Sequence, residues 1–213
     1  MARPPNPIPA PEPQPPTRRA PRPPKAERDG IRRLEIVTAA RACVLRHGFH
    51  AASMAEIGAE ARMSVGQIYR YYASKEAIVQ AIVEHIVSKR LAWIGTTKGD
   101  ADLPALLATR SLSDEEAEDH ALLLEATAEA SRNPAVAATV KEADRRLHER
   151  AVDAVIQDHP WLTPAQAAAR VEVMAVLMEG TAFRRVTGQP ADRQHLAEVY
   201  RSVIAHLFEP PPP

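Results

Sequence analysis

The chain has 213 residues, of which 45% are hydrophobic and only 4% aromatic, and its 27 Lys and Arg residues balance 27 Asp and Glu residues. That length predicts one or two domains, and the single Cys43 excludes an intrachain disulfide and a zinc site built on cysteines. No apolar run approaches the roughly 18 residues that a membrane-spanning helix requires, and no apolar segment follows the basic N-terminus as in a secretory signal. We therefore expect a cytoplasmic protein with no membrane partner.

Proline is concentrated at the two ends of the sequence. Eleven of the 20 prolines lie in residues 1–24 and four in 210–213. The long middle part is poor in Gly and Pro and rich in Ala, Leu, Glu and Arg, which indicates an all-α protein.

Charge is divided unevenly along the chain. Residues 1–76 carry 13 Lys and Arg against seven acids, whereas residues 77–213 carry 14 against 20. A basic N-terminal third on an acidic remainder is typical of a nucleic-acid-binding region attached to a larger body, although differences of this size also arise by chance.

Residues 1–28 form a tail rich in Pro and Arg, with too little apolar content to fold. Four cations, Arg18, Arg19, Arg22 and Lys25, stand just before the first expected helix. They could contact DNA phosphates as a flexible arm, or they could only keep the chain soluble.

The first helix is expected over residues 30–47. Gly48 follows as the residue that ends it, with Phe49 as its apolar partner. Cys43 falls on the apolar stripe of this helix, and we expect a buried structural thiol.

Residues 53–75 predict two short helices separated by a tight turn. Ser53 with Glu56, and Ser64 with Gln67, each form a capping box, which indicates that one helix begins after Ser53 and another after Ser64. The second should run over residues 65–71, too short to be stable without packing. Met54, Ile57, Ala61 and Ile68 are the expected inward side chains. Two helices in this order form a helix-turn-helix, which places its second helix in the major groove of DNA.

This segment resembles the tetracycline-repressor (TetR) family of transcription regulators. The resemblance covers about residues 32–80 and is carried by Gly48-Phe49, Ser53-Met54-Ala55-Glu56-Ile57, residues 65–72 (VGQIYRYY) and Ser74-Lys75-Glu76. Family members usually have Thr at the position of Ser53 and often Phe at that of Tyr72, and both differences are chemically mild. The resemblance implies about nine helices, three of them in the DNA-binding head.

Further helices follow from local start and stop signals. A helix should begin after Ser74 and reach about Trp93, and a short one is expected over 103–110. Ser113 with Glu116 predicts a helix to about residue 132. Asn133-Pro134 predicts one to about 159, and Thr163-Pro164 one to about 186, ended by Gly188. The last should span 192–208. We find no credible strand and no internal repeat.

The expected DNA contacts lie in and around the two short helices. Small residues at the start of the second helix would let its backbone approach the bases, Gln67 is the best base-reading candidate, and the tyrosine hydroxyls and Lys75 suit phosphates or base edges. The set is Ser53, Met54, Ser64, Val65, Gly66, Gln67, Tyr69, Tyr71 and Lys75. For Tyr72, a place in the core is the favoured interpretation.

The resemblance implies that the remaining helices bind a small molecule and a second copy of the chain. Candidate pocket residues are Trp93, Leu123, Thr127, His148, Met174, Met178 and Phe183, and core packing is the alternative for each. The resemblance places the dimer face on the last two helices, where Val171, Met174, Met178, Leu196, Val199, Val203 and Leu207 form apolar stripes. Glu125 and Glu129 could attract a cation or face solvent. The histidines are too scattered to predict a metal site, and no cofactor is expected.

These features predict an all-α fold: a Pro-rich and Arg-rich tail at 1–28, a three-helix DNA-binding domain at 29–76, a helical ligand-binding and dimerisation domain at 77–208, and a Pro tail at 209–213. The expected function is that of a homodimeric repressor, released from operator DNA by a small-molecule inducer. A helical adaptor that binds protein through residues 53–75 is the alternative. An all-α enzyme is less favoured, because no nucleophile–His–acid order, phosphate-binding Gly loop or metal-binding motif occurs.

Overall fold

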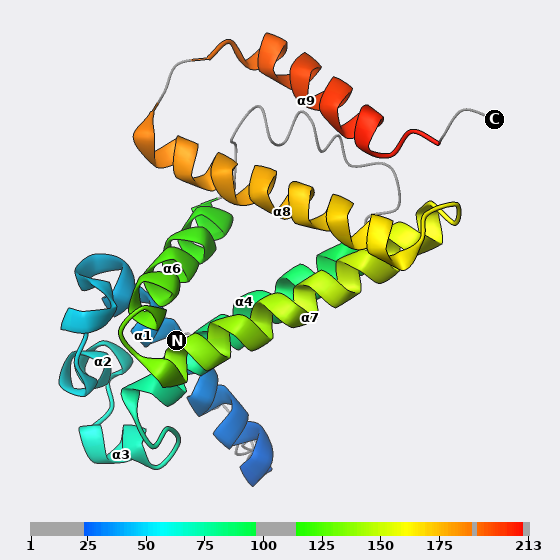
Figure 1. Ribbon diagram of the computed structural model, residues 1–213. Helices are drawn as coiled ribbons and strands as arrows, with labels where there is room; N and C mark the ends of the chain where they lie inside the picture. The colour runs from blue at the N-terminus through cyan, green and yellow to red at the C-terminus, as the bar shows by residue number, and fades with distance from the viewer. Residues whose placement is uncertain (1–23, 97–113, 189–190, 211–213) are drawn as a thin grey trace, which may run out of the picture.

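The computed structural model describes residues 24–96, 114–188 and 191–210, and within them it contains eight α-helices and no strand (Figure 1). The all-α prediction is therefore confirmed, while the short helix expected over 103–110 lies outside the described residues. The helices are α1 (Lys25–Ala51), α2 (Met54–Ala61), α3 (Val65–Tyr69), α4 (Lys75–Thr96), α6 (Asp114–Ala130), α7 (Pro134–Asp158), α8 (Pro164–Thr187) and α9 (Arg193–Leu207).

Most helix starts follow the capping signals of the sequence. The side chains of Ser53, Ser64 and Thr163 each accept a hydrogen bond from the backbone N–H three residues on, and all three capping boxes are complete. Asn133 caps α7 and Asp192 caps α9 in the same way. These bonds satisfy N–H groups that a helix leaves unpaired in its first turn. The residue at which each of these helices begins is therefore determined by its neighbours in sequence.

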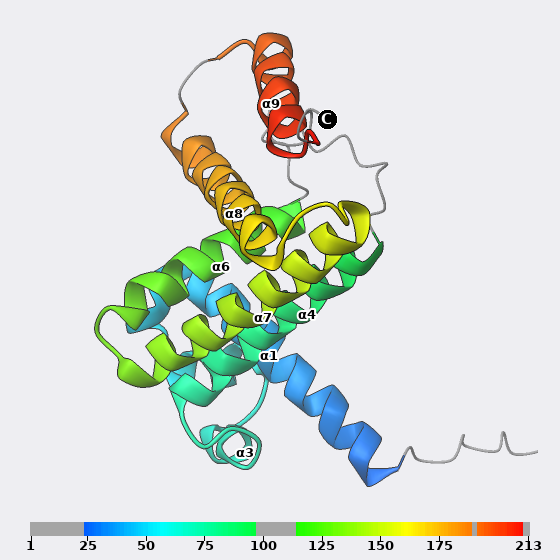
Figure 2. The ribbon, with the colours of Figure 1, turned by 45° about the vertical axis from the view of Figure 1, so that its right-hand side comes forward.

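Helix α1 begins earlier than the sequence predicts. It starts at Lys25 instead of residue 30, so residues 25–28, which were assigned to the tail, are helical. Its side chains over residues 24–35 are exposed, apart from a half-buried Asp29. Figure 2 shows this part of α1 projecting from the rest of the molecule. Gly48 ends the regular part of α1 as predicted, because its φ of 75° and ψ of 166° are not helical.

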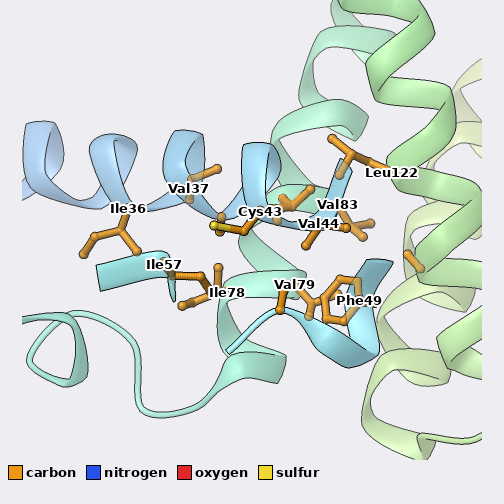
Figure 3. Packing of buried hydrophobic residues seen from close by; sticks show 14 of the residues in the cluster. Ile36, Val37, Cys43, Val44, Phe49, Ile57, Ile78, Val79, Val83 and Leu122 are labelled. Atoms are coloured by element: carbon orange, nitrogen blue, oxygen red, sulfur yellow. The ribbon is translucent and has the colours of Figure 1, made fainter. Parts of the chain in front are cut away.

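The core lies where α1, α2, α3, α4 and α6 converge. Ile36, Cys43, Ile57 and Ile78 are each at most 1% exposed, and Figure 3 shows them among the labelled side chains between α1, α2 and α4, with Leu122 of α6 at one side. Burial raises the pKa of the Cys43 thiol, which fits the predicted structural role. The same cluster continues into α7. The expected domain boundary at residues 76–77 thus falls inside one continuous core.

The remaining helices form a second layer beyond that core. Helix α7 packs along α4 and α6, and α8 packs on α7 (Figure 1). Helix α9 is tied to this layer at separate points. The ring of Phe208 stacks on His159 with centroids 4.8 Å apart, Arg170 donates to the Leu207 carbonyl at 2.5 Å, and the hydroxyls of Thr181 and Tyr200 are 3.5 Å apart.

The described ranges contain neither a candidate membrane-spanning helix nor a candidate metal cluster. None of the helices there combines the length and the apolar content needed to cross a membrane. Nor do three or more His, Cys, Asp or Glu side chains within those ranges come close enough together to hold a metal ion.

Candidate nucleic-acid interface

The turn between α2 and α3 depends on one glycine and one left-handed residue. Met63 donates its N–H to the carbonyl of Gly58 at 2.9 Å, and Arg62 adopts a φ of 55° to make this possible. A Cβ on Gly58 would lie 2.9 Å from the Met63 carbonyl oxygen, closer than a carbon can approach. Gly58 is therefore required by the close approach of two backbones, a constraint that the sequence analysis did not identify.

Helix α3 is anchored by one side chain and exposes the rest of its surface. Ile68 is 0% exposed, whereas Val65 is 37% and Tyr69 51% exposed. Gly66 and Gln67 are also exposed. The predicted inward and outward faces of this helix are confirmed for these five residues, which leaves a short helix with a small, mixed apolar and polar outer face. A face of this kind fits the major groove of DNA.

Gln67 has an intramolecular partner that limits how it can read a base. Its Oε1 accepts the N–H of Ser64 at 2.8 Å, and its own N–H donates to the Ser64 hydroxyl at 3.2 Å. A two-bond contact with adenine uses both the oxygen and the nitrogen of the amide. With Oε1 in the capping box, the side-chain NH₂ of this exposed residue is the group left to donate to a base, and it suits acceptors such as the guanine O6 or the thymine O4.

The tyrosines after α3 differ from one another. Tyr71 was expected to face outward, but it is half-buried, and its hydroxyl lies 3.4 Å from a carboxylate oxygen of Asp29 on α1. Tyr72 is only 8% exposed, so the interpretation of Tyr72 as a core residue is confirmed. Burial raises the pKa of Tyr72, which keeps its hydroxyl protonated to donate to the Arg33 carbonyl at 3.4 Å.

Arg33 joins these tyrosines to α1 and was missed by the sequence analysis. Its guanidinium donates to the Tyr71 carbonyl at 2.8 Å and lies 5.3 Å from the centre of the Tyr72 ring. Both contacts bridge more than 35 positions of sequence, so no local signal marks them. They fix the exposed first part of α1 beside the C-terminal end of α3.

At the N-terminus of α2, two backbone donors have no recorded partner among the described residues. The Glu56 carboxylate accepts the Ser53 N–H at 2.8 Å and the Ser53 hydroxyl at 3.0 Å, and these bonds lower the pKa of Glu56. The Ser53 hydroxyl in turn accepts the Glu56 N–H. The backbone N–H groups of the intervening Met54 and Ala55 are not used by this box. They are the donors at this end that a phosphate could take up.

Lys75 has a structural role that its sequence position did not reveal. Its ammonium donates to the carbonyls of Phe49 and His50 at 3.0 and 3.1 Å and lies 5.9 Å from the centre of the Phe49 ring. These carbonyls end α1, so Lys75 caps that end from the first residue of α4. An ammonium has three N–H donors, so one is left for a phosphate.

Two carboxylates of α6, those of Glu125 and Asp119, bind this helix to α1 and α4. Glu125 accepts the Phe49 N–H at 3.0 Å. Asp119, whose side chain is 8% exposed, lies 2.7 Å from both Arg41 of α1 and Lys89 of α4. Burial alone raises the pKa of Asp119, but hydrogen bonds from Lys89 and Arg41 outweigh it and lower that pKa. Glu125, one of the two carboxylates considered for binding a cation or facing solvent, thus accepts a hydrogen bond from the backbone of α1.

Several of the expected pocket residues are exposed or bonded within their own helix. Trp93 and Phe183 are 41% and 55% exposed, and the Thr127 hydroxyl donates to the carbonyl of Leu123 in its own helix. A half-open hollow of about 210 Å³ lies between α4 and α7, and none of the seven predicted residues borders it. It is lined by Gln80, Val83, Glu84, Ala138, Thr139, Glu142, Ala143 and Arg146.

The expected dimer residues on α8 and α9 differ in how far their side chains are exposed. Val171 is 6% exposed within a single chain, so its side chain is not available to a second copy. Met174, Leu196 and Leu207 are half-buried. Three of the expected dimer residues are large, apolar and exposed: Met178, Val199 and Val203. Three further exposed apolar side chains on α8 were not expected at the dimer face: Val173, Val176 and Phe183.

Known proteins share both the sequence and the geometry of this head. Residues 36–82 match the profile described as bacterial regulatory proteins, tetR family. This part of the chain is therefore similar to the DNA-binding region of TetR-family regulators. A curated relative, the HTH-type transcriptional regulator UidR of Escherichia coli (strain K12), is 34% identical over 122 residues, or 55% of this chain. The match spans only 61% of the length of UidR.

Solved structures extend the likeness to the second layer of helices. Salmonella enterica GusR superimposes with a TM-score of 0.68 at 22% identity, covering 84% of this chain and 96% of GusR. FadR from Bacillus subtilis, solved in complex with stearoyl-CoA, gives a TM-score of 0.58 at 18% identity over 83% of this chain and 97% of FadR. A Saccharomonospora viridis regulator solved with choline gives 0.64 at 16%, with coverage of 83% and 97%. At these identities the likeness supports the fold.

Proposed function

We propose that this chain is a TetR-like transcriptional regulator that binds operator DNA as a homodimer and responds to a small molecule, most simply as a repressor released by an inducer. The exposed outer face of α3 carries the proposal. A helix of five residues is held by one buried side chain, Ile68, while Val65, Gly66, Gln67 and Tyr69 face away from the protein. A helix this short has no packing role on that side, and base edges are the partners its side chains fit.

The proposed contacts divide into base reading and positioning. Val65, Gly66 and the Gln67 NH₂ would meet base edges, and Tyr69 would meet a base edge or a phosphate. The N-terminus of α2, with Ser53 and Met54, the cap residue Ser64, and the third N–H of Lys75 would hold phosphates. Tyr71 is the weakest of the expected contacts, because its hydroxyl faces Asp29.

A second copy of the chain is needed for adequate affinity, because one helix of five residues covers a single half-site. The exposed apolar side chains on α8 and α9, among them Met178, Val199 and Val203, support a dimer face there. Apolar side chains gathered on two adjacent helices favour association, as in a four-helix interface.

The response to a ligand would pass through α4. This helix runs without interruption from Lys75, at the edge of the head, to Thr96, and it packs along α7 of the second layer (Figure 2). A ligand that shifts the far end of α4 would therefore tilt the head and alter the spacing of the two copies of α3. Relatives solved with stearoyl-CoA and with choline show that this fold accommodates small molecules of different chemistry.

The test is fluorescence anisotropy with DNA from upstream of the protein's own gene, a scrambled duplex of equal length, and several salt concentrations. The proposal expects tight binding that prefers the upstream fragment and weakens steeply with salt through counterion release. Absence of binding to either duplex at low salt would contradict the proposal and favour a protein-binding adaptor. Once binding is established, small molecules that lower the anisotropy identify the inducer.

A further inference from the structure

We infer that the first three turns of α1 are a second DNA-contacting element, which lies along the phosphates that flank the sequence read by α3. This inference rests on the proposed DNA-binding function and assigns it a further surface. The element is called the α1 extension and consists of residues 25–35. It supplies cations beside α3 and not a second base-reading helix.

The α1 extension buries almost none of its side chains against the rest of the described chain. Apart from a half-buried Asp29, all its side chains are exposed, including Ile31 at 49% and Leu34 at 55%. The first buried residue of α1 is Ile36. The extension continues the packed part of α1 as one helix, and its contacts with the end of α3 hold it in place beside that helix.

Those contacts fix where the α1 extension points. The Tyr71 hydroxyl lies 3.4 Å from Asp29, the Tyr71 carbonyl accepts a hydrogen bond from Arg33 at 2.8 Å, and the Tyr72 hydroxyl donates to the Arg33 carbonyl. Figures 1 and 2 both show the start of α1 projecting at the end of the molecule that carries α3. A DNA duplex lying against the outer face of α3 would thus pass close to the extension.

Two cations on the extension are available to phosphates. The extension holds four cations and three carboxylates, but Arg33 is engaged with the tyrosines and Arg32 is paired with Glu35 at 2.6 Å. For Lys25 and Arg28 the structure records no ion pair among the described residues, and both are exposed.

Helical geometry places Lys25 in line with the anchored side chains. It precedes Asp29 by four positions and Arg33 by eight, so it lies on the same face, about 6 and about 12 Å further out at 1.5 Å per residue. Arg28 lies on the neighbouring face, four positions before Arg32. Since DNA rises 3.4 Å per phosphate along each strand, this span covers about three or four phosphates beyond the α3 contact.

The experiment compares full-length protein carrying Lys25→Gln and Arg28→Gln with the unchanged protein, and with a control variant carrying Lys141→Gln and Arg145→Gln. The control removes the same charge from exposed positions on α7, away from α3. Each protein is titrated by anisotropy against the upstream duplex over a series of salt concentrations. Circular dichroism and thermal melts verify that all three are folded.

Loss of two phosphate contacts per chain, and so four per dimer, should reduce the slope of log K against log salt by about 3 to 4 units in the double variant and leave the control unchanged. Trimming the duplex to the bases covered by α3 should weaken the unchanged protein towards the level of the double variant, and should affect the double variant little. A slope and a length dependence equal to those of the unchanged protein would overturn the α1 extension while leaving DNA binding by α3 intact. Failure of the unchanged protein to bind any duplex would instead overturn the proposed function together with this inference.

Discussion

Gln67 combines a structural and a recognition role in one amide. The oxygen closes the capping box with Ser64, and the NH₂ is the group proposed to donate to a base. Replacement by Ala should reduce the preference for operator over scrambled DNA by about 1–3 kcal/mol, because a base-edge donor is lost. It should also lower the free energy of unfolding by about 0.5–1.5 kcal/mol, because a cap hydrogen bond is lost. Anisotropy on both duplexes and urea denaturation separate the two effects.

Glu56→Ala is the matched control for Gln67→Ala. Glu56 closes the equivalent box on α2 with Ser53, so its removal should cost similar stability without altering sequence preference. If both variants lower the preference equally, Gln67 acts by shaping the helix and not by reading a base.

Gly58 illustrates a backbone constraint at a single residue. Ala normally stabilises a helix by about 1 kcal/mol relative to Gly, but at position 58 its Cβ would meet the Met63 carbonyl at 2.9 Å. We expect Gly58→Ala to lower the free energy of unfolding by about 1–3 kcal/mol, as overpacking does. Gly180→Ala on α8, where a Cβ has no neighbour within 4 Å, should be neutral or stabilising. Urea denaturation of the two variants checks the contrast, and a stable Gly58→Ala protein would contradict it.

Between elements, Lys75 joins the start of α4 to the end of α1. Lys75→Ala removes the donor shared by the Phe49 and His50 carbonyls, and we expect the free energy of unfolding to fall by about 1–2 kcal/mol. If the third N–H also holds a phosphate, the salt slope of DNA binding should fall by about two units per dimer.

Lys75→Met, which keeps the aliphatic stem over the Phe49 ring, separates packing from charge in this pair. Unchanged stability in both variants would contradict the capping role. An unchanged salt slope would remove Lys75 from the phosphate contacts.

The elements that were predicted correctly are those whose ends are marked by neighbours in sequence. Ser53 with Glu56 and Ser64 with Gln67 are three residues apart, and Asn133 and Thr163 are each followed by Pro, so these helix starts needed no knowledge of the fold. Gly48 was identified as the end of regular helix for the same reason.

The features that were missed depend on partners far away in sequence. The early start of α1, the inward turn of Tyr71, the use of Lys75 as a cap and the Glu125 contact all join segments at least 25 positions apart. No periodicity or motif reports on such pairs. The exposed face of α3 could therefore be predicted, whereas the contacts that hold α3 against α1, and α1 against α6, could not.

At the scale of the whole molecule, Asp119 holds three helices together. It pairs with Arg41 and Lys89, and Asp119→Asn would leave both cations without their buried partner. We expect the free energy of unfolding at pH 7 to fall by about 2–4 kcal/mol, somewhat less than for a fully buried pair because Lys89 is 36% exposed. Glu115→Gln, which removes the exposed partner of the same lysine, should cost less than about 1 kcal/mol.

The same carboxylate should make stability depend on acid. The pKa of Asp119 is lower in the folded state than its unfolded value of 3.8, so the unfolded chain binds the proton more readily. The stabilisation is then fully present above about pH 4 to 5 and is lost as the pH falls through the folded pKa. Unfolding measured between pH 6 and 2.5 should show a decline that Asp119→Asn makes shallower, and parallel curves for the two proteins would exclude this linkage.

The contact of residues 48 and 49 with Glu125 restricts the substitutions that these positions can accept. Glu125 binds the backbone N–H of Phe49, a group that every residue except proline possesses, so the bond itself places no demand on the side chain at 49. Position 48 is restricted twice, because its φ is 75° and because a Cβ would lie 3.2 Å from the Glu125 carboxylate. A library of variants should accordingly tolerate few residues at position 48, and at position 125 only residues that can accept a hydrogen bond at a similar distance. Substitutions at these two positions should therefore be correlated.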